Sequence, residues 1–185
     1  MENRVDSIYS RLELKIRDSV IDGTIIMPKF IFDRSVKWCD DNKERSGIFV
    51  VKFQPIEKGM LYIIQSYVLL GIGTEYHVKQ NKNRVKAFNM LMSHLRENSS
   101  GDFGIIEFHT HTVSTGKFWY DKFSPGDYES FKSAIKEDIN YCHILITPEN
   151  ILINSNGIMN LIIKDSDKSI HKSHSRIFKL LLKSI

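Results

Sequence analysis

The spacing of hydrophobic and polar residues changes along the chain between a pattern typical of strands and one typical of helices. This predicts strands interleaved with helices. Short apolar runs bounded by turn residues are typical of buried strands. Apolar residues that recur every three or four positions indicate helices, as at Val85, Phe88, Met92 and Leu95. The predicted strands cover residues 25–27, 47–53, 60–70, 74–78, 104–111, 142–147, 150–154 and 158–164. The predicted helices cover residues 29–40, 81–98, 124–140 and 169–185.

This alternation predicts an α/β fold in which helices pack on the faces of a sheet. The dipeptide Asn156-Gly157 predicts a hairpin between the last two strands. Residues 1–23 have apolar positions at helical spacing, but part of the stretch also alternates like a strand. Residues 169–185 predict a basic amphipathic helix, which we expect to dock on its own domain. Homo-oligomerisation or an activating partner bound through this helix is the alternative.

The bulk composition limits the class of protein. A chain of 185 residues suits one domain. Its net charge of +4 is dispersed and no nucleic-acid-binding motif appears, so we do not expect a nucleic-acid partner. The two cysteines, Cys39 and Cys142, are predicted to be reduced thiols. The charged N-terminus has no apolar signal region, and no apolar run reaches the roughly 18 residues of a membrane span. These features predict a soluble, cytoplasmic protein without a membrane partner.

The strand 104–111 carries a candidate metal site. Because alternate residues of a strand share a face, Glu107, His109 and His111 point to the same side. Two imidazoles about 7 Å apart along a strand can converge on one ion. A catalytic zinc ion takes three protein ligands, so a third must come from elsewhere. The histidine pair can equally be incidental.

A second motif opens the helix that follows. In Ser124-Pro125-Gly126-Asp127, serine suits the N-cap, proline suits the first helical position, and an acidic residue suits the third. Such a segment can serve only as a helix cap. The combination of the two motifs, HxH followed by SxxD, is more specific than either alone.

That combination resembles the signature of the JAMM (MPN-type) zinc metallopeptidases. The resemblance implies that His109, His111 and Asp127 bind Zn²⁺ and that Ser124 helps to stabilise a tetrahedral intermediate. It also implies a glutamate general base ahead of an earlier strand, and the segment Glu44-Arg45-Ser46-Gly47 followed by IFVVKF offers Glu44.

The resemblance covers roughly residues 24–165 and implies a mixed, curved β-sheet flanked by helices. Residues 1–23 would then be an N-terminal extension, and residues 166–185 a C-terminal basic amphipathic helix. Residues 112–123 form a longer linker than is usual in the family, and Thr112 stands where the family commonly has proline. The long linker leaves Asp121 as a rival metal ligand, and Glu107 is a rival ligand or base.

The function implied by the resemblance is hydrolysis of a peptide or isopeptide bond after the C-terminal tail of a ubiquitin-like protein. The alternative is a catalytically inactive MPN-type scaffold or interaction module. Loop residues Phe118, Trp119 and Tyr120 can form an apolar ledge for substrate, or can pack down to anchor the loop. We do not expect a zinc nucleobase deaminase, because the chain lacks H-x-E and PCxxC.

Overall fold

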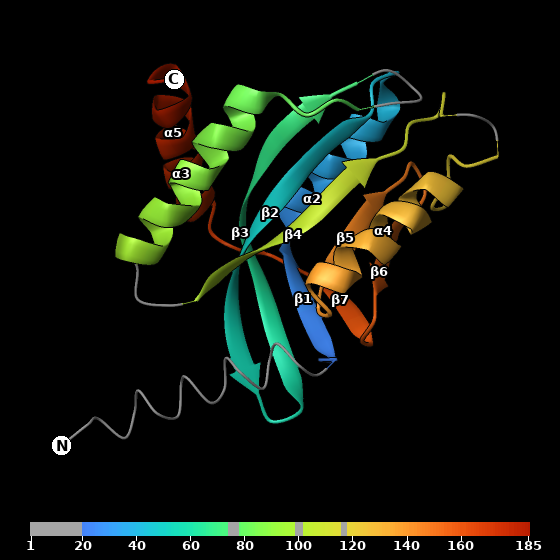
Figure 1. Cartoon of the computed structure of the whole chain (residues 1–185), viewed down its shortest axis with the longest axis horizontal. Coiled ribbons are helices and arrows are strands. Elements are labelled where there is room, and N and C mark those ends of the chain that lie inside the picture. The colour runs from blue at the N-terminus through green and yellow to red at the C-terminus, as the bar shows by residue number, and fades with distance from the viewer. Residues whose placement is uncertain (1–19, 74–77, 99–101, 116–117) are drawn as a thin grey trace.

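The computed structural model describes residues 20–73, 78–98, 102–115 and 118–185. Residues 1–19 of the predicted N-terminal extension, for which a helix and a strand were both open, and most of the predicted strand at 74–78 lie outside these ranges. Figure 1 shows helices on both sides of one continuous sheet. The strands are β1 (Gly23–Pro28), β2 (Arg45–Ile56), β3 (Gly59–Ile72), β4 (Phe103–Thr110), β5 (Cys142–Ile146), β6 (Ile151–Ser155) and β7 (Met159–Lys164). The helices are α2 (Lys29–Val36), the 3-10 turn η1 (Lys37–Asp40), α3 (Lys82–Asn98), α4 (Pro125–Glu137) and α5 (Ser169–Lys183).

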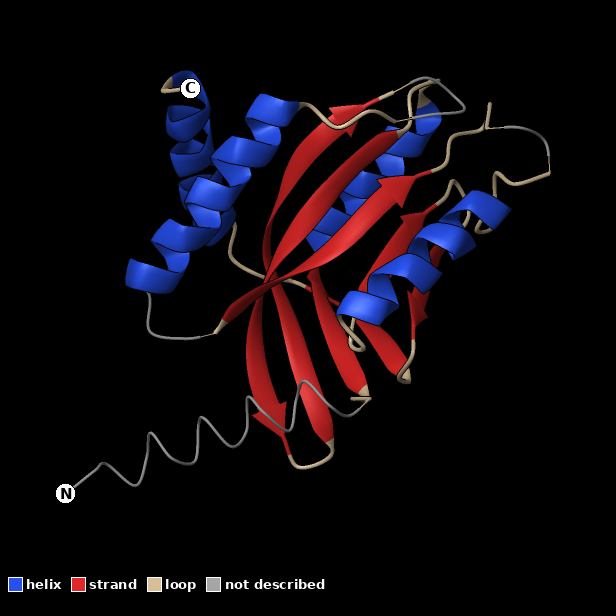
Figure 2. Cartoon of the chain, viewed as in Figure 1, coloured by secondary structure: helices blue, strands red, loops and turns tan. Residues whose placement is uncertain are grey.

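The sheet is mixed, and its seven strands lie in the order β6-β5-β4-β2-β3-β1-β7. The β2–β3, β2–β4 and β5–β6 pairs are antiparallel, whereas β1 lies parallel to β3 and β7, and β4 lies parallel to β5. Figure 2 shows the strong twist of this sheet. The prediction of an α/β fold with a mixed, curved sheet and flanking helices is confirmed at this level.

The prediction of a β-hairpin at Asn156-Gly157 is wrong. A turn does form there, but it joins β6 and β7, which stand at opposite ends of the strand order. Only residues 156–158 connect the two edge strands, so the edges must lie close together and the sheet curls into a nearly closed barrel. The local turn signal was correct, but the pairing of β7 with β1 replaces the expected hairpin.

Both faces of the central strands are buried. Phe49 and Phe108 stack at 4.3 Å between ring centroids inside the curved sheet, where Trp38 of η1 covers Phe108. The alternate residues Ile48 and Val50 pack instead under α3 and α5, with Leu91 and Phe178 among their neighbours. Burial on both faces explains why β2 reads as a continuous apolar run instead of an alternating one.

Helix α5 docks on its own chain through two histidines. His174 lies at 2.8 Å from the Ser66 hydroxyl of β3, and His171 stacks on Tyr67 at 4.7 Å between centroids. The Arg84 guanidinium of α3 lies 5.8 Å from the ring centroid of Phe178. Within the described residues, no helix is long and apolar enough to cross a membrane.

Acidification is expected to weaken this docking. Burial, together with the charge of His171, lowers the pKa of His174 from 6.5. The unfolded chain therefore binds a proton here at a pH where the folded chain does not. The contribution of neutral His174 to the free energy of unfolding is present above about pH 6.5. It is lost as the pH falls, by at most about 1.4 kcal/mol per pH unit for one histidine. Denaturant unfolding at about pH 7.5 and pH 5.5 should show a smaller pH dependence for His174→Gln than for the wild type. An equal dependence would contradict this.

Candidate metal centre

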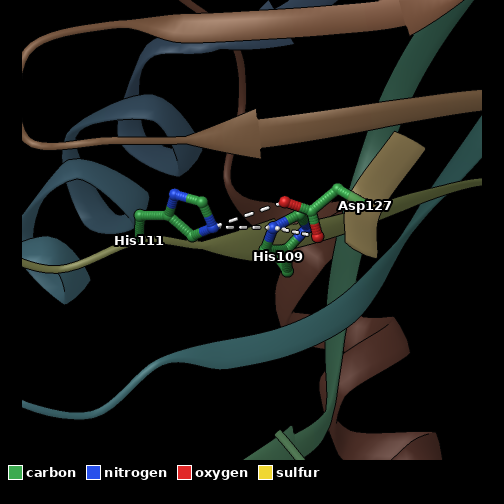
Figure 3. A group of neighbouring side chains, drawn as sticks. All are labelled: His109, His111 and Asp127. Carbon is green, nitrogen blue, oxygen red and sulfur yellow. Dashed lines mark hydrogen bonds and ion pairs between the residues drawn. The ribbon is translucent and has the colours of Figure 1, made fainter. Parts of the chain in front are cut away.

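Three segments of the chain meet at the carboxyl end of β4. His109 lies in β4, and His111 follows the strand with its backbone N–H still donating to the Ile146 carbonyl at 2.9 Å. Asp127 lies in the first turn of α4, which follows the linker of residues 112–123. Figure 3 shows the two imidazoles and the carboxylate turned toward one another.

The separations between these side chains suit one ion. Nε2 of His109 and Nε2 of His111 are 3.2 Å apart, and Oδ1 of Asp127 is 3.2 Å from Nε2 of His109. Oδ2 of Asp127 lies 3.6 Å from Nε2 of His111. Ligand bonds of 2.0–2.2 Å in a tetrahedron place neighbouring ligand atoms about 3.3 Å apart. Among the described residues, these three side chains therefore form a group that can hold one metal ion.

His111 is in the protonation state that binds a metal ion. Burial, followed by the charge of His109, lowers the pKa of His111, so its imidazole is neutral near pH 7. Nδ1 of His111 lies 2.6 Å from the Trp119 carbonyl, which can only accept a hydrogen bond. The proton of this imidazole is therefore on Nδ1, and Nε2 presents its lone pair to the site.

Asp127 is ionised and held in direction by Ser124. Burial alone would raise the pKa of Asp127, but the neighbouring His109 imidazole and hydrogen bonds from Ser124 lower it well below its usual range. The backbone N–H and the hydroxyl of Ser124 both donate to Oδ2 at 2.7 Å. Oδ2 is thereby occupied, and Oδ1 is left for the ion. Ser124 and Asp127 form the predicted capping box as well.

The Ser124 hydroxyl therefore has an orienting contact in this structure. Its proton is donated to Asp127, so it is not free to donate to a developing oxyanion. The intermediate-stabilising role that the resemblance implies for Ser124 requires this hydroxyl to turn away from the carboxylate.

Glu44 lies directly before β2, which is the strand next to β4. Its side chain is only 7% exposed, and Oε1 accepts a hydrogen bond from the Thr115 hydroxyl at 2.8 Å. The described residues give Oε2 no partner. Burial raises the pKa of Glu44, while the Thr115 hydrogen bond and the charge of His109 oppose this rise. A buried carboxylate with a raised pKa and one free oxygen is the form expected of a general base.

The two rival residues have other positions. Glu107 accepts a hydrogen bond from the Tyr141 hydroxyl at 2.9 Å, and it is not a member of the group that converges on the ion site. Asp121 is half-buried in the linker and is also not part of that group among the described residues.

The three aromatic loop residues differ in exposure and contacts. Phe118 is 66% exposed and lies edge-on to Trp119, with the Lys122 ammonium 4.1 Å from its ring centroid. The Tyr120 hydroxyl donates a hydrogen bond to Oε1 of Glu149 at 3.3 Å. Trp119 orients His111 through its backbone carbonyl. Of the three aromatic side chains, Phe118 is the exposed one.

His143 of β5 belongs to the site and was missed in the sequence. Its Nε2 atom lies 2.6 Å from Nδ1 of His109. Burial, followed by the charge of His109, lowers the pKa of His143 to about 3, so this imidazole is neutral. The alternation Tyr141-x-His143 was the available signal, but nothing local indicates that β5 pairs with β4.

Comparisons with known proteins show structural likenesses but no family. The sequence matches no protein-family model and shows no significant similarity to a curated protein. The chain is similar to the solution structure of protein DSY2949 from Desulfitobacterium hafniense, with a TM-score of 0.46 and 10% sequence identity. That match covers 80% of this chain and 98% of the other. A likeness of this size carries no functional argument, and the family resemblance rests on the sequence motifs.

Proposed function

We propose that the protein is a JAMM-type, zinc-dependent metallopeptidase that hydrolyses a peptide or isopeptide bond. The observation that carries the proposal is the convergence of His109, His111 and Asp127 at separations that suit a tetrahedral ion, with the buried carboxylate of Glu44 beside them. Two histidines and one carboxylate also match the ligand set of known zinc peptidases, which keep a fourth position for water.

The chemistry divides between the ion and the chain. When bound, zinc supplies a Lewis acid for the carbonyl and lowers the pKa of water toward about 7. Glu44 accepts the proton of the attacking water at Oε2 and delivers it to the nitrogen of the leaving amine. The Thr115 hydroxyl holds Oε1 and so fixes the direction of the free oxygen. Because Glu44 is buried, few waters compete for this proton.

The proposed substrate is the C-terminal tail of a ubiquitin-like protein or its conjugate. This part of the proposal comes from the family resemblance. The exposed ring of Phe118, in the linker that also orients His111, is the proposed contact for an apolar residue of that tail. The proposed compartment is the cytoplasm, where the buried free thiols of Cys39 and Cys142 stay reduced.

Cleavage of a ubiquitin-like fusion tests this function. The zinc-loaded protein should release the fused partner after the tail, and a chelator should abolish the release. Added zinc should restore it. Phe118→Ala should raise KM more than it lowers kcat. Bound zinc without any cleavage of linear or isopeptide-linked substrates would contradict the enzyme and favour the inactive scaffold.

A further inference from the structure

A chain of hydrogen bonds runs away from the metal centre through two strands. Glu107 of β4 pairs with His143 of the parallel strand β5, so both side chains lie on the face that carries His109. Nδ1 of His109 lies 2.6 Å from Nε2 of His143, and Nδ1 of His143 lies 2.9 Å from the Tyr141 hydroxyl. That hydroxyl lies 2.9 Å from Oε2 of Glu107.

The direction of each hydrogen bond follows from the end of the chain. The Tyr141 hydroxyl donates its single proton to Oε2 of Glu107. The Tyr141 oxygen then accepts from His143, which places the His143 proton on Nδ1. An imidazole that donates from Nδ1 accepts at Nε2, so His109 donates to His143 from Nδ1. Nε2 of His109 is therefore left with a lone pair that faces His111 and Asp127.

We propose that His143, held by Tyr141 and Glu107, is a positioning residue that fixes the metal-binding tautomer of His109. The inference rests on the metal centre proposed above and deepens it. Both ligand imidazoles are then oriented from outside the HxH motif. The Trp119 carbonyl orients His111, and a second histidine orients His109.

The surroundings keep this order of protons stable. Burial, followed by the charge of Glu107, raises the pKa of Tyr141, so its hydroxyl keeps the proton that it donates. Phe131 of α4 lies against the Tyr141 ring at 5.8 Å between centroids, and Phe123 lies 6.2 Å from the His143 ring. These apolar neighbours exclude water that could replace a member of the chain. Partners that orient metal-binding histidines typically change metal affinity by about 10- to 100-fold.

Two substitutions of His143 separate positioning from packing. In His143→Gln, the side-chain carbonyl can still accept the proton from His109. In His143→Leu, volume is kept but the acceptor is lost. We expect zinc affinity, measured by chelator competition, to fall about 10- to 100-fold in His143→Leu and to stay within about threefold of the wild type in His143→Gln. Tyr141→Phe should give a smaller loss, because only the orientation of His143 is released.

The tautomer itself is the readout that a packing role would not move. In protein labelled with ¹⁵N-histidine, long-range ¹H–¹⁵N spectra should show His109 protonated at Nδ1 in the wild type and in His143→Gln, and a mixture of tautomers in metal-free His143→Leu. An unchanged tautomer and an unchanged zinc affinity in His143→Leu would overturn the proposal. Equal losses in the Gln and Leu variants would also overturn it, because they would indicate packing alone.

This experiment separates the inference from the proposed function. Zinc binding and the tautomer are measured without any substrate, so an inactive scaffold that binds zinc would still give the expected result. If the wild type binds no zinc, the metal centre fails, and the positioning role fails with it. If the wild type binds zinc and His143→Leu binds it equally well, the inference alone fails.

Discussion

Replacing Glu44 by glutamine is expected to lower kcat by about 10²- to 10⁴-fold while leaving the zinc content unchanged. The amide oxygen of glutamine can still accept the Thr115 hydroxyl, so the side chain should keep its place. It has lost the basic oxygen that takes a proton from water. Steady-state cleavage of a ubiquitin-like fusion, together with metal analysis of the same sample, measures both quantities.

A matched variant guards against a general effect of removing a carboxylate. Glu97→Gln makes the same change on the exposed end of α3, far from the site in the sequence, and should retain full activity and zinc. Full activity in Glu44→Gln would show that another group removes the proton. Loss of zinc in Glu44→Gln would instead place Glu44 among the ligands.

The second large effect is expected from Asp127→Asn. Asparagine can still accept hydrogen bonds from Ser124, so the start of α4 should persist, but the anionic ligand is gone. Zinc affinity should fall by more than about 100-fold, since the loss of an orienting partner alone costs about 10- to 100-fold. Competition with a coloured chelator measures the change, and thermal unfolding checks that the variant is folded.

Asp121→Asn is the control for this substitution. Asp121 carries the same charge in the linker ahead of α4, and the variant should bind zinc as the wild type does. The reverse outcome, in which Asp121→Asn loses zinc and Asp127→Asn keeps it, would move the third ligand from the helix to the linker.

Much of the fold was predictable because its signals are local. The apolar spacing at Val85, Phe88 and Met92 predicted α3, and Ser124-Pro125 predicted the start of α4. The predicted core of β2 was correct, although the strand continues through polar residues to Ile56 because β3 pairs with it along that whole length. The closure of the sheet was not predictable, because Asn156-Gly157 predicts a turn but does not indicate which strand pairs with β7.

The candidate site was predictable where motifs are contiguous in sequence. Strand periodicity placed His109 and His111 on one face, and the helix start placed Asp127 in the first turn of α4, but only the family resemblance joined the two motifs into one metal site. His143 and Tyr141 were not found, because their place beside His109 depends on the parallel register of β4 and β5. The Trp119 carbonyl was not predictable either, since any residue supplies a backbone carbonyl.

The central claim is that one ion joins the end of β4 to the start of α4. Anomalous diffraction at the zinc absorption edge, from crystals of the zinc-loaded protein, tests it most directly. The account predicts one strong peak within about 2.2 Å of Nε2 of His109, Nε2 of His111 and Oδ1 of Asp127. Zinc-loaded crystals with no peak between these atoms, or with their strongest peak beside His171 and His174 of α5, would contradict it.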